Sequence, residues 1–222
     1  MKATIHQPNF LPYLGFFDKC DYANILVLYD STQFKKNDFQ NRNRLKGKEK
    51  WFWLTVPIIY NFGNKINEVK IDNSKEWKNI HLKALETCYS KSKYFEKYFP
   101  KVKIIYERDW EFLSNFNIEL IRFILKELNI KCKIVLSSEL AINTRGTEAL
   151  VEICKKIKST EYISGKDGKK YLDISLFKNE NLKVQFQNYK HPTYKQRFKK
   201  FEPYMCILDL LFNEGANSLK VI

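Results

Sequence analysis

The stretch that decides the fold lies at the start of the chain, where residues 2–19 read KATIHQPNFLPYLGFFDK. The short apolar run Ala3–Ile5 predicts a β-strand, which breaks into polar residues and two prolines before an apolar segment with helical spacing. A strand, a rigid turn and a helix are the unit with which an open α/β sheet builds a ligand crevice at the carboxyl end of its first strand. Because proline fixes φ, Pro8 and Pro12 are expected to hold His6 in a stiff loop.

The rest of the chain alternates strands and helices around this start. Strands are predicted at Ala3–Ile5, Ile25–Tyr29, Trp51–Val56, Ile66–Ile71, Lys133–Leu136 and Glu161–Ile163. Helices are predicted at Trp77–Cys88, Tyr94–Arg108, Phe112–Leu128 and Thr147–Lys158. The alternation at both ends favours an α/β fold with an open, mainly parallel, Rossmann-like sheet and an additional helical block. We therefore expect one domain over residues 1–222, with a helical insertion or subdomain at residues 75–129.

Composition restricts the classes of protein to which the chain can belong. Its hydrophobic content of 44% argues against a disordered protein. No apolar run approaches the roughly 18 residues of a transmembrane helix, and the start lacks the pattern of a signal peptide. The five cysteines form no C-x-x-C pair, which argues against a zinc ribbon. We expect a cytoplasmic protein with reduced thiols, without membrane insertion and without a metal site.

The formal net charge of +14 comes almost entirely from lysine. Such a charge favours an anionic partner, such as a nucleotide, a sugar phosphate, RNA or a membrane surface. The abundance of Lys, Asn and Ile has a second explanation, because an AT-rich genome imposes these residues on exposed positions. No basic stripe interleaved with spaced aromatic residues is present, so the sequence argues against a general nucleic-acid-binding protein.

Polar side chains follow the first two predicted strands. His6, Gln7 and Asn9 come after the first strand. A single histidine is often structural, but here its near-neutral pKa would also suit a general base or a phosphate ligand. Asp30 ends the second strand, and its carboxylate could orient a sugar hydroxyl or hold magnesium. Gln33 follows close behind and adds an amide.

Two later clusters add groups that bind anions. Lys36 precedes the run Asn41-Arg42-Asn43, in which a planar guanidinium lies between two amides, as suits a phosphate or a carboxylate. Ser164, Gly165 and Lys166 follow the last predicted strand and could form an anion-binding turn, with Tyr194 and Gln196 further along the chain. A solvated loop is the alternative for each cluster. We expect the histidine turn, the Asn-Arg segment and the Ser-Gly bend to line one pocket.

These clusters, in this order, resemble the WbqC-like family of bacterial proteins. The matching runs include HQPN at residues 6–9, LGFFDK at 14–19, NRN at 41–43, WLTVP at 53–57, YISG at 162–165 and DLLFN at 209–213. The resemblance implies a role in surface-polysaccharide biosynthesis, such as O-antigen or capsule formation. The chain departs from the family pattern at Tyr29, where the family usually has a second aspartate beside Asp30.

The start of the chain is also similar, more loosely, to that of the HIGH-type nucleotidyltransferases, which hold ATP phosphates with a histidine-containing turn. Only one histidine is present here, and none follows Gly15, so the H-x-G-H signature is incomplete. This likeness implies a possible use of ATP and magnesium as cofactors.

Three functions are consistent with these residues. The leading hypothesis is an enzyme that transfers an acyl or aminoacyl group to the amino sugar of a nucleotide-linked substrate. His6 would be its base, Arg42, Lys36 and Lys166 would bind phosphates, and the amides would orient sugar hydroxyls. The second hypothesis is ATP-dependent adenylyl transfer with magnesium. The third is a non-catalytic module that binds a nucleotide-linked sugar or a tRNA; the oligomeric state stays open.

Overall fold

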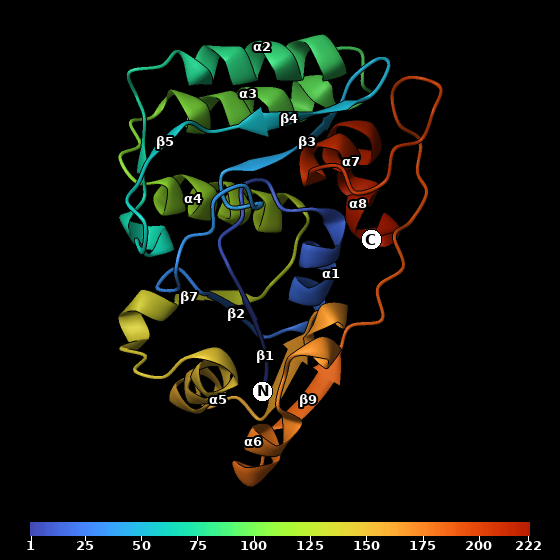
Figure 1. Ribbon diagram of the computed structural model, residues 1–222. Helices are drawn as coiled ribbons and strands as arrows, with labels where there is room; N and C mark the ends of the chain where they lie inside the picture. Colours follow the sequence, from blue (N-terminus) through green and yellow to red (C-terminus); the bar gives the residue numbers. More distant parts are fainter.

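The computed structural model describes residues 1–222 and contains a five-stranded parallel sheet (Figure 1). The strands of this sheet are β1 (Lys2–His6), β2 (Ile25–Leu28), β7 (Lys133–Leu136), β8 (Glu161–Ser164) and β9 (Lys183–Phe186). Their order in space is β7-β2-β1-β8-β9, and each neighbouring pair is parallel. The expected open α/β fold with a mainly parallel sheet is therefore confirmed.

Apolar residues on both faces explain why β2 lies inside the sheet. All four of its residues are buried, as expected for a central strand covered by helices on both sides. Leu26 and Leu28 pack into a large core, whereas Ile25 and Val27 pack into a smaller core on the opposite face. Successive strand residues point to opposite faces, so one apolar run contributes to both cores.

Helices cover both faces of the sheet (Figure 1). The large core is built with α1 (Leu14–Tyr22), α2 (Trp77–Tyr89), α3 (Phe95–Glu107), α4 (Leu113–Glu127) and α7 (Ile207–Glu214), and the short α8 (Ser218–Val221) packs beside them. The small core lies under α5 (Gly146–Lys156) and α6 (Ile174–Asn179). The helical block expected beside the sheet is present as α2, α3 and α4. Its status as a subdomain at residues 75–129 stays a prediction. None of these helices combines the length and the hydropathy that crossing a bilayer requires.

Short elements lie between the main strands and helices. They are the antiparallel strands β3 (Arg42–Lys46) and β4 (Trp51–Thr55), the small pair β5 (Ile58–Ile59) and β6 (Lys70–Ile71), and the 3-10 turns η1 (Ile66–Glu68), η2 (Ser137–Leu140), η3 (Lys166–Lys170) and η4 (Gly215–Asn217). The strand predicted over Ile66–Ile71 is wrong in its first half. Ile66 and Val69 are both completely buried, so the run follows a 3-10 spacing rather than the alternation of a strand.

The connections of the sheet reverse direction beside β1. From β1 the chain builds outward through β2 and β7 and then returns to add β8 and β9 on the other side. In such sheets the ligand crevice lies outside the carboxyl ends of the strands at this reversal. The fold therefore directs attention to the ends of β1, β2, β7 and β8.

Candidate functional site

A cavity of about 1240 Å³ opens at the carboxyl ends of β1, β2 and β7. Residues that directly follow these strands form its floor, and the segment from η2 to the start of α5 forms one wall. Its polar and charged lining residues are His6, Gln7, Tyr29, Ser31, Thr32, Gln33, Lys65, Asn67, Ser137, Ser138, Asn143, Thr144, Arg145, Thr147, Tyr162 and Tyr171. The cavity thus occupies the position at which the sheet topology predicts a ligand.

The charge of the lining has one sign. None of the 22 lining residues is Asp or Glu, whereas Lys65 and Arg145 are both among them. The other polar groups are hydroxyls and amides, apart from one imidazole. A lining with these groups favours a ligand that carries both anionic groups and hydroxyls.

His6 lies at the end of β1 and is half-buried in the lining of the cavity. Its Nδ1 is 3.0 Å from the Gln7 carbonyl oxygen, which can only accept, so Nδ1 carries the proton and Nε2 keeps its lone pair. The edge of the ring packs against Phe16, with the two ring centroids 5.0 Å apart. Burial first, and the nearby Lys19 ammonium second, lower the pKa of His6 to about 3. The near-neutral pKa expected from the sequence is therefore wrong, and the imidazole is neutral.

Lys19 is a cation of this region that the sequence reasoning did not single out. It lies on α1 and is 5% exposed, and its ammonium makes neither a hydrogen bond nor an ion pair within the chain. Burial lowers the pKa of its ammonium to about 8. Its charge opposes protonation of His6, so α1 contributes to keeping the imidazole neutral.

Asp30 lies immediately behind the cavity wall and is 3% exposed. Its Oδ1 accepts a hydrogen bond from the Ser137 hydroxyl at 2.9 Å and another from the Ser138 backbone N–H at 2.9 Å. Its Oδ2 accepts from the Ser138 hydroxyl at 2.7 Å. The carboxylate itself is not part of the lining, so it acts on a ligand through these serines.

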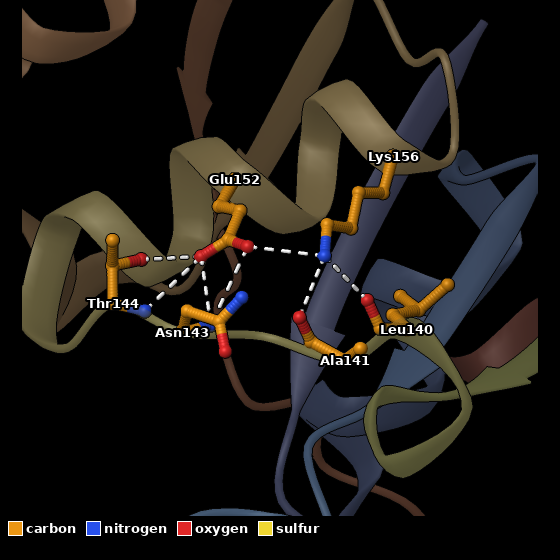
Figure 2. Close-up of polar contacts among 6 residues, drawn as sticks. All are labelled: Leu140, Ala141, Asn143, Thr144, Glu152 and Lys156. Carbon is orange, nitrogen blue, oxygen red and sulfur yellow. Dashed lines mark hydrogen bonds and ion pairs between the residues drawn. The ribbon is translucent and has the colours of Figure 1, made fainter.

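The wall between η2 and α5 is held in place by Glu152 and Lys156 of α5 (Figure 2). The Glu152 carboxylate accepts hydrogen bonds from the backbone N–H groups of Asn143 and Thr144, both at 3.1 Å, and from the Thr144 hydroxyl at 2.7 Å. Lys156 pairs with Glu152 at 3.1 Å and donates to the carbonyl of Ala141 at 2.6 Å. These bonds lower the pKa of Glu152 to about 2, with the Thr144 hydroxyl as the largest cause.

The chain enters α5 through backbone conformations that fix the direction of this wall. Ala141 and Gly146 have φ values of +49° and +59°, the left-handed region in which glycine is favoured. Arg145 lies between them, exposed on the rim of the cavity. The network around Glu152 therefore holds the backbone from which the Arg145 side chain extends.

The Asn-Arg segment does not reach the cavity. Asn41 donates to the Val56 carbonyl at 3.0 Å, and Asn43 donates to the Leu11 carbonyl at 2.7 Å. Both amides are buried and hold neighbouring backbone together. The Arg42 guanidinium lies 4.3 Å from the centre of the Trp53 ring and donates to the Asn37 carbonyl.

The Ser-Gly bend also lies outside the lining. Ser164 is buried at the end of β8, where its hydroxyl donates to the Gly165 carbonyl at 3.2 Å. Lys166 is exposed at the start of η3. The expected convergence of three stretches on one pocket is thus corrected, since only the histidine turn lines this cavity.

Four further predicted residues lie apart from the cavity. Tyr194 and Gln196 donate to the buried carboxylate of Asp209, at 2.6 Å and 2.8 Å. Lys36 is exposed and lines a smaller hollow that shares Gln33 and Gly63 with the cavity, and Asn9 is half-buried in the opening turn. Of the predicted site residues, His6, Gln7 and Gln33 are brought together in the lining.

The lining also contains residues that the sequence reasoning missed. Ser137 and Ser138 follow a predicted strand, and parallel pairing of that strand with β2 would have located them. Lys65, Asn67 and Arg145 lie in irregular segments, where no periodic pattern marks a site. No group of three or more His, Cys, Asp and Glu side chains is arranged to hold a metal ion.

Comparison with known proteins assigns the family. The chain matches the WbqC-like protein family over residues 7–221. This chain belongs to the WbqC-like family. Uncharacterized protein Rv1507c of Mycobacterium tuberculosis is 34% identical to it over 221 residues, which cover 98% of this chain and 95% of the relative. No solved structure matches the chain.

Membership confirms the resemblance found in the sequence. The match includes the cavity-lining residues from Gln7 to Tyr171, but not Ile5 and His6, and it includes the helical block. The name of this relative assigns no reaction. The chemistry of this WbqC-like site must therefore be argued from its own residues.

Proposed function

We propose that this WbqC-like chain is an enzyme of surface-polysaccharide biosynthesis that acts on a nucleotide-activated sugar. The reaction we favour is the transfer of an acyl or aminoacyl group to the amino group of the sugar. The carrying observation is the cavity at the ends of β1, β2 and β7, which has cationic, hydroxyl and amide groups but no carboxylate in its lining. Phosphates suit the cations, and sugar hydroxyls suit the amides and serines.

In this proposal the phosphate-binding groups are Arg145 and Lys65, because these cations line the cavity. They replace Arg42, Lys36 and Lys166, which lie elsewhere. Gln7 and Gln33 keep the predicted role of orienting sugar hydroxyls, since both line the cavity. Positioning of the two reactants by such contacts can supply about 7–11 kcal/mol of a barrier.

His6 is the proposed base. Its Nδ1 proton is committed to the Gln7 carbonyl, and Nε2 makes no hydrogen bond within the chain, so the Nε2 lone pair is free. The amine nitrogen attacks the acyl carbon, a C–N bond forms, and the bond from the acyl carbon to the leaving group breaks. The nitrogen becomes positively charged as it attacks, and only then can a base with a pKa near 3 take its proton. Nε2 passes the proton to the leaving group.

Adenylyl transfer with magnesium is supported less well by the donor set. Magnesium in nucleotide-processing sites is usually bound by one or two carboxylates together with phosphates. The lining offers no carboxylate, and Asp30 is occupied by the serines behind the wall. The residues present therefore do not fit a magnesium ion held in this cavity.

A non-catalytic binding module is the second candidate. The low pKa of His6 favours it, because so weak a base suits a fixed hydrogen-bond acceptor. The net charge of +14 would favour an anionic partner for such a module, whether a nucleotide-linked sugar or RNA.

The deciding experiment combines ligand binding with a transfer assay on His6→Gln. UDP-, dTDP- and GDP-linked amino sugars are offered with acyl-coenzyme A or aminoacyl-tRNA as donor, and product is followed by mass spectrometry. Loss of general-base catalysis should lower the turnover number by about 10²–10⁴-fold, with sugar affinity nearly unchanged. A binding module would bind the same sugars without turnover in the parent. Equal turnover by parent and His6→Gln would remove His6 from the mechanism.

A further inference from the structure

Two serine hydroxyls on one wall of the cavity have no proton left to offer a ligand. Ser31 follows β2, and Ser138 follows β7, so parallel pairing of these strands brings the two residues to the same edge of the sheet. Both line the cavity, and Asp30 lies behind them. Ser137 connects Ser31 to Asp30, because its Oγ lies 2.8 Å from the Ser31 Oγ and 2.9 Å from the Asp30 Oδ1.

The directions of these hydrogen bonds follow from the carboxylate. An ionised carboxylate only accepts, so the hydroxyls of Ser137 and Ser138 must both donate to Asp30. The single proton of Ser137 is then used, and the Ser31 hydroxyl must donate to Ser137. Ser137 also accepts from the Ser31 backbone N–H at 3.1 Å and is thereby saturated. Only the lone pairs of Ser31 and Ser138 remain free to face the cavity.

The charge behind this wall has no cationic partner. Asp30 takes part in no ion pair, and its hydrogen bonds come from two serine hydroxyls and one backbone N–H. A buried carboxylate polarises the hydroxyls that donate to it, and their oxygens become stronger acceptors. This wall therefore favours a hydrogen-bond donor, in contrast to Lys65 and Arg145 in the same lining, which favour an acceptor.

We propose that the Ser31 and Ser138 oxygens, backed by Asp30, form the subsite that binds the amino group of the sugar substrate. This inference rests on the proposed function and assigns the two ends of the substrate, with the amine at the serines and the phosphates at Lys65 and Arg145. An amine or ammonium offers several N–H donors to the two oxygens. Only the neutral amine has the lone pair that attacks, so a bound ammonium first loses a proton to solvent. Acylation then leaves a single N–H, so the product is held less tightly here.

The first test compares three probes in calorimetry: UDP-glucosamine, UDP-glucose and UDP-N-acetylglucosamine. The parent should bind UDP-glucosamine most tightly, because it alone offers an amine. Ser31→Ala and Ser138→Ala each remove a hydrogen bond to a charged group. Each variant should therefore bind UDP-glucosamine about 10- to 100-fold more weakly than the parent. Their binding of UDP-N-acetylglucosamine should change much less. Ser138→Thr keeps the hydroxyl and should restore the preference for the amine.

Ser74→Ala is the matched control. Ser74 also donates to an aspartate, with its Oγ 2.6 Å from the Asp72 Oδ1, but it is exposed and lies outside the lining. The Ser74→Ala variant should bind all three probes with the affinities of the parent. Equal losses for the amine and the N-acetyl probe in Ser138→Ala, or no loss for either, would overturn the inference while leaving the proposed function intact.

Failure of the proposed function is recognised separately. If the parent binds none of the UDP-linked probes, free glucosamine and glucose are titrated while the backbone amides of Ser137 and Ser138 are followed by NMR. Shifts with glucosamine that are absent with glucose, and absent in Ser31→Ala, would support an amine subsite independently of nucleotide sugars. The absence of any shift would contradict it.

Discussion

Asp30 and Asp209 are both buried aspartates with hydroxyl donors, yet they belong to different kinds of environment. Asp209 on α7 is completely buried and accepts from Tyr89 at 3.0 Å, as well as from Tyr194 and Gln196. Burial raises the pKa of this carboxyl. All of its partners lie within the protein, outside the cavity lining. Asp209 therefore joins α7 to the helical block and to the segment before it.

The serines that donate to Asp30 also line the cavity. The Ser138 hydroxyl donates a hydrogen bond to the carboxylate, and Ser138 also lines a cavity large enough for a ligand. Burial and hydrogen bonding alone therefore do not distinguish a structural carboxylate from a functional one. The distinction lies in whether the partners still have free lone pairs at a cavity.

The largest effect on stability is expected for Asp209→Ala. The substitution removes the acceptor of the buried Tyr89 and Tyr194 hydroxyls, whereas Gln196 keeps the Glu202 carbonyl, and each buried polar group left unsatisfied costs about 1–3 kcal/mol. The free energy of unfolding should fall by at least about 2 kcal/mol, measured by urea denaturation. The free energy of unfolding should fall less in Asp30→Ala, because Ser138 is exposed and its hydroxyl can bind water instead. A greater loss for Asp30→Ala would reverse the comparison.

The next effect concerns the dependence of stability on pH at His6. Its pKa is about 3 in the folded protein and about 6.5 in the unfolded chain. Between these values only the unfolded chain binds the proton, so stability is full above pH 6.5 and falls as the pH is lowered toward 3. One such group lowers the free energy of unfolding by about 1.4 kcal/mol for each pH unit between these two pKa values.

His6→Gln should therefore show a shallower loss of stability than the parent between pH 6 and pH 4. The variant still has the buried imidazole of His81, with a pKa of about 4, so the slope of the variant does not vanish. Denaturant unfolding at each pH supplies the measurement. Parallel curves for the two proteins would contradict a neutral, half-buried imidazole at position 6.

A smaller and more local effect is expected for Glu152→Gln. The neutral amide keeps the shape but weakens the bonds to Asn143, Thr144 and Lys156 shown in Figure 2. The Asn143 and Thr144 amides should exchange with solvent roughly two- to tenfold faster, as expected for one weakened hydrogen bond. Glu148→Gln, an exposed residue of the same helix, is the control and should leave both rates unchanged. Unchanged exchange in Glu152→Gln would mean that the wall is held by other contacts.

The smallest effect on ligand binding is expected for Arg42→Ala. Its guanidinium is engaged by Trp53 and lies outside the cavity, so the affinity for a nucleotide-linked sugar should stay near that of the parent. The stacking contact contributes about 0.5–1 kcal/mol to stability. Arg145→Ala should show the opposite pattern, with weaker binding and unchanged stability. Calorimetry and thermal unfolding of the two variants separate the alternatives.

The sequence predicted the sheet best where apolar runs were long and clearly ended. Prolines and polar residues bound the first strand, and β2 is apolar throughout, so both were located correctly. The edge strand β9 was missed, because Lys183-Val-Gln-Phe186 alternates over only four residues. A weak edge strand is recognised from its pairing with β8, which the sequence does not display.

The site was predicted only in part, because polar side chains satisfy backbone as readily as ligands. The sequence suggested a loop for Asn41 and Asn43, but Asn43 lies in β3 and Asn41 directly precedes it, and their amides hold carbonyl groups of the chain itself. His6 and Gln7 were found because they directly follow a strand of a parallel sheet. Arg145 was missed, because its position depends on Glu152 and Lys156 in the following helix rather than on its own neighbours.

The hydrogen bond between Ser137 and Asp30 connects residues 107 positions apart in the chain. During synthesis on the ribosome, β1 and β2 emerge early and can pair, but β7 follows only after the whole helical block has been made. One edge of β2 therefore stays unpaired until β7 has been made, and strands of separate chains associate at unpaired edges. Slow translation or loss of the helical block would therefore expose nascent chains to aggregation before a binding cavity exists.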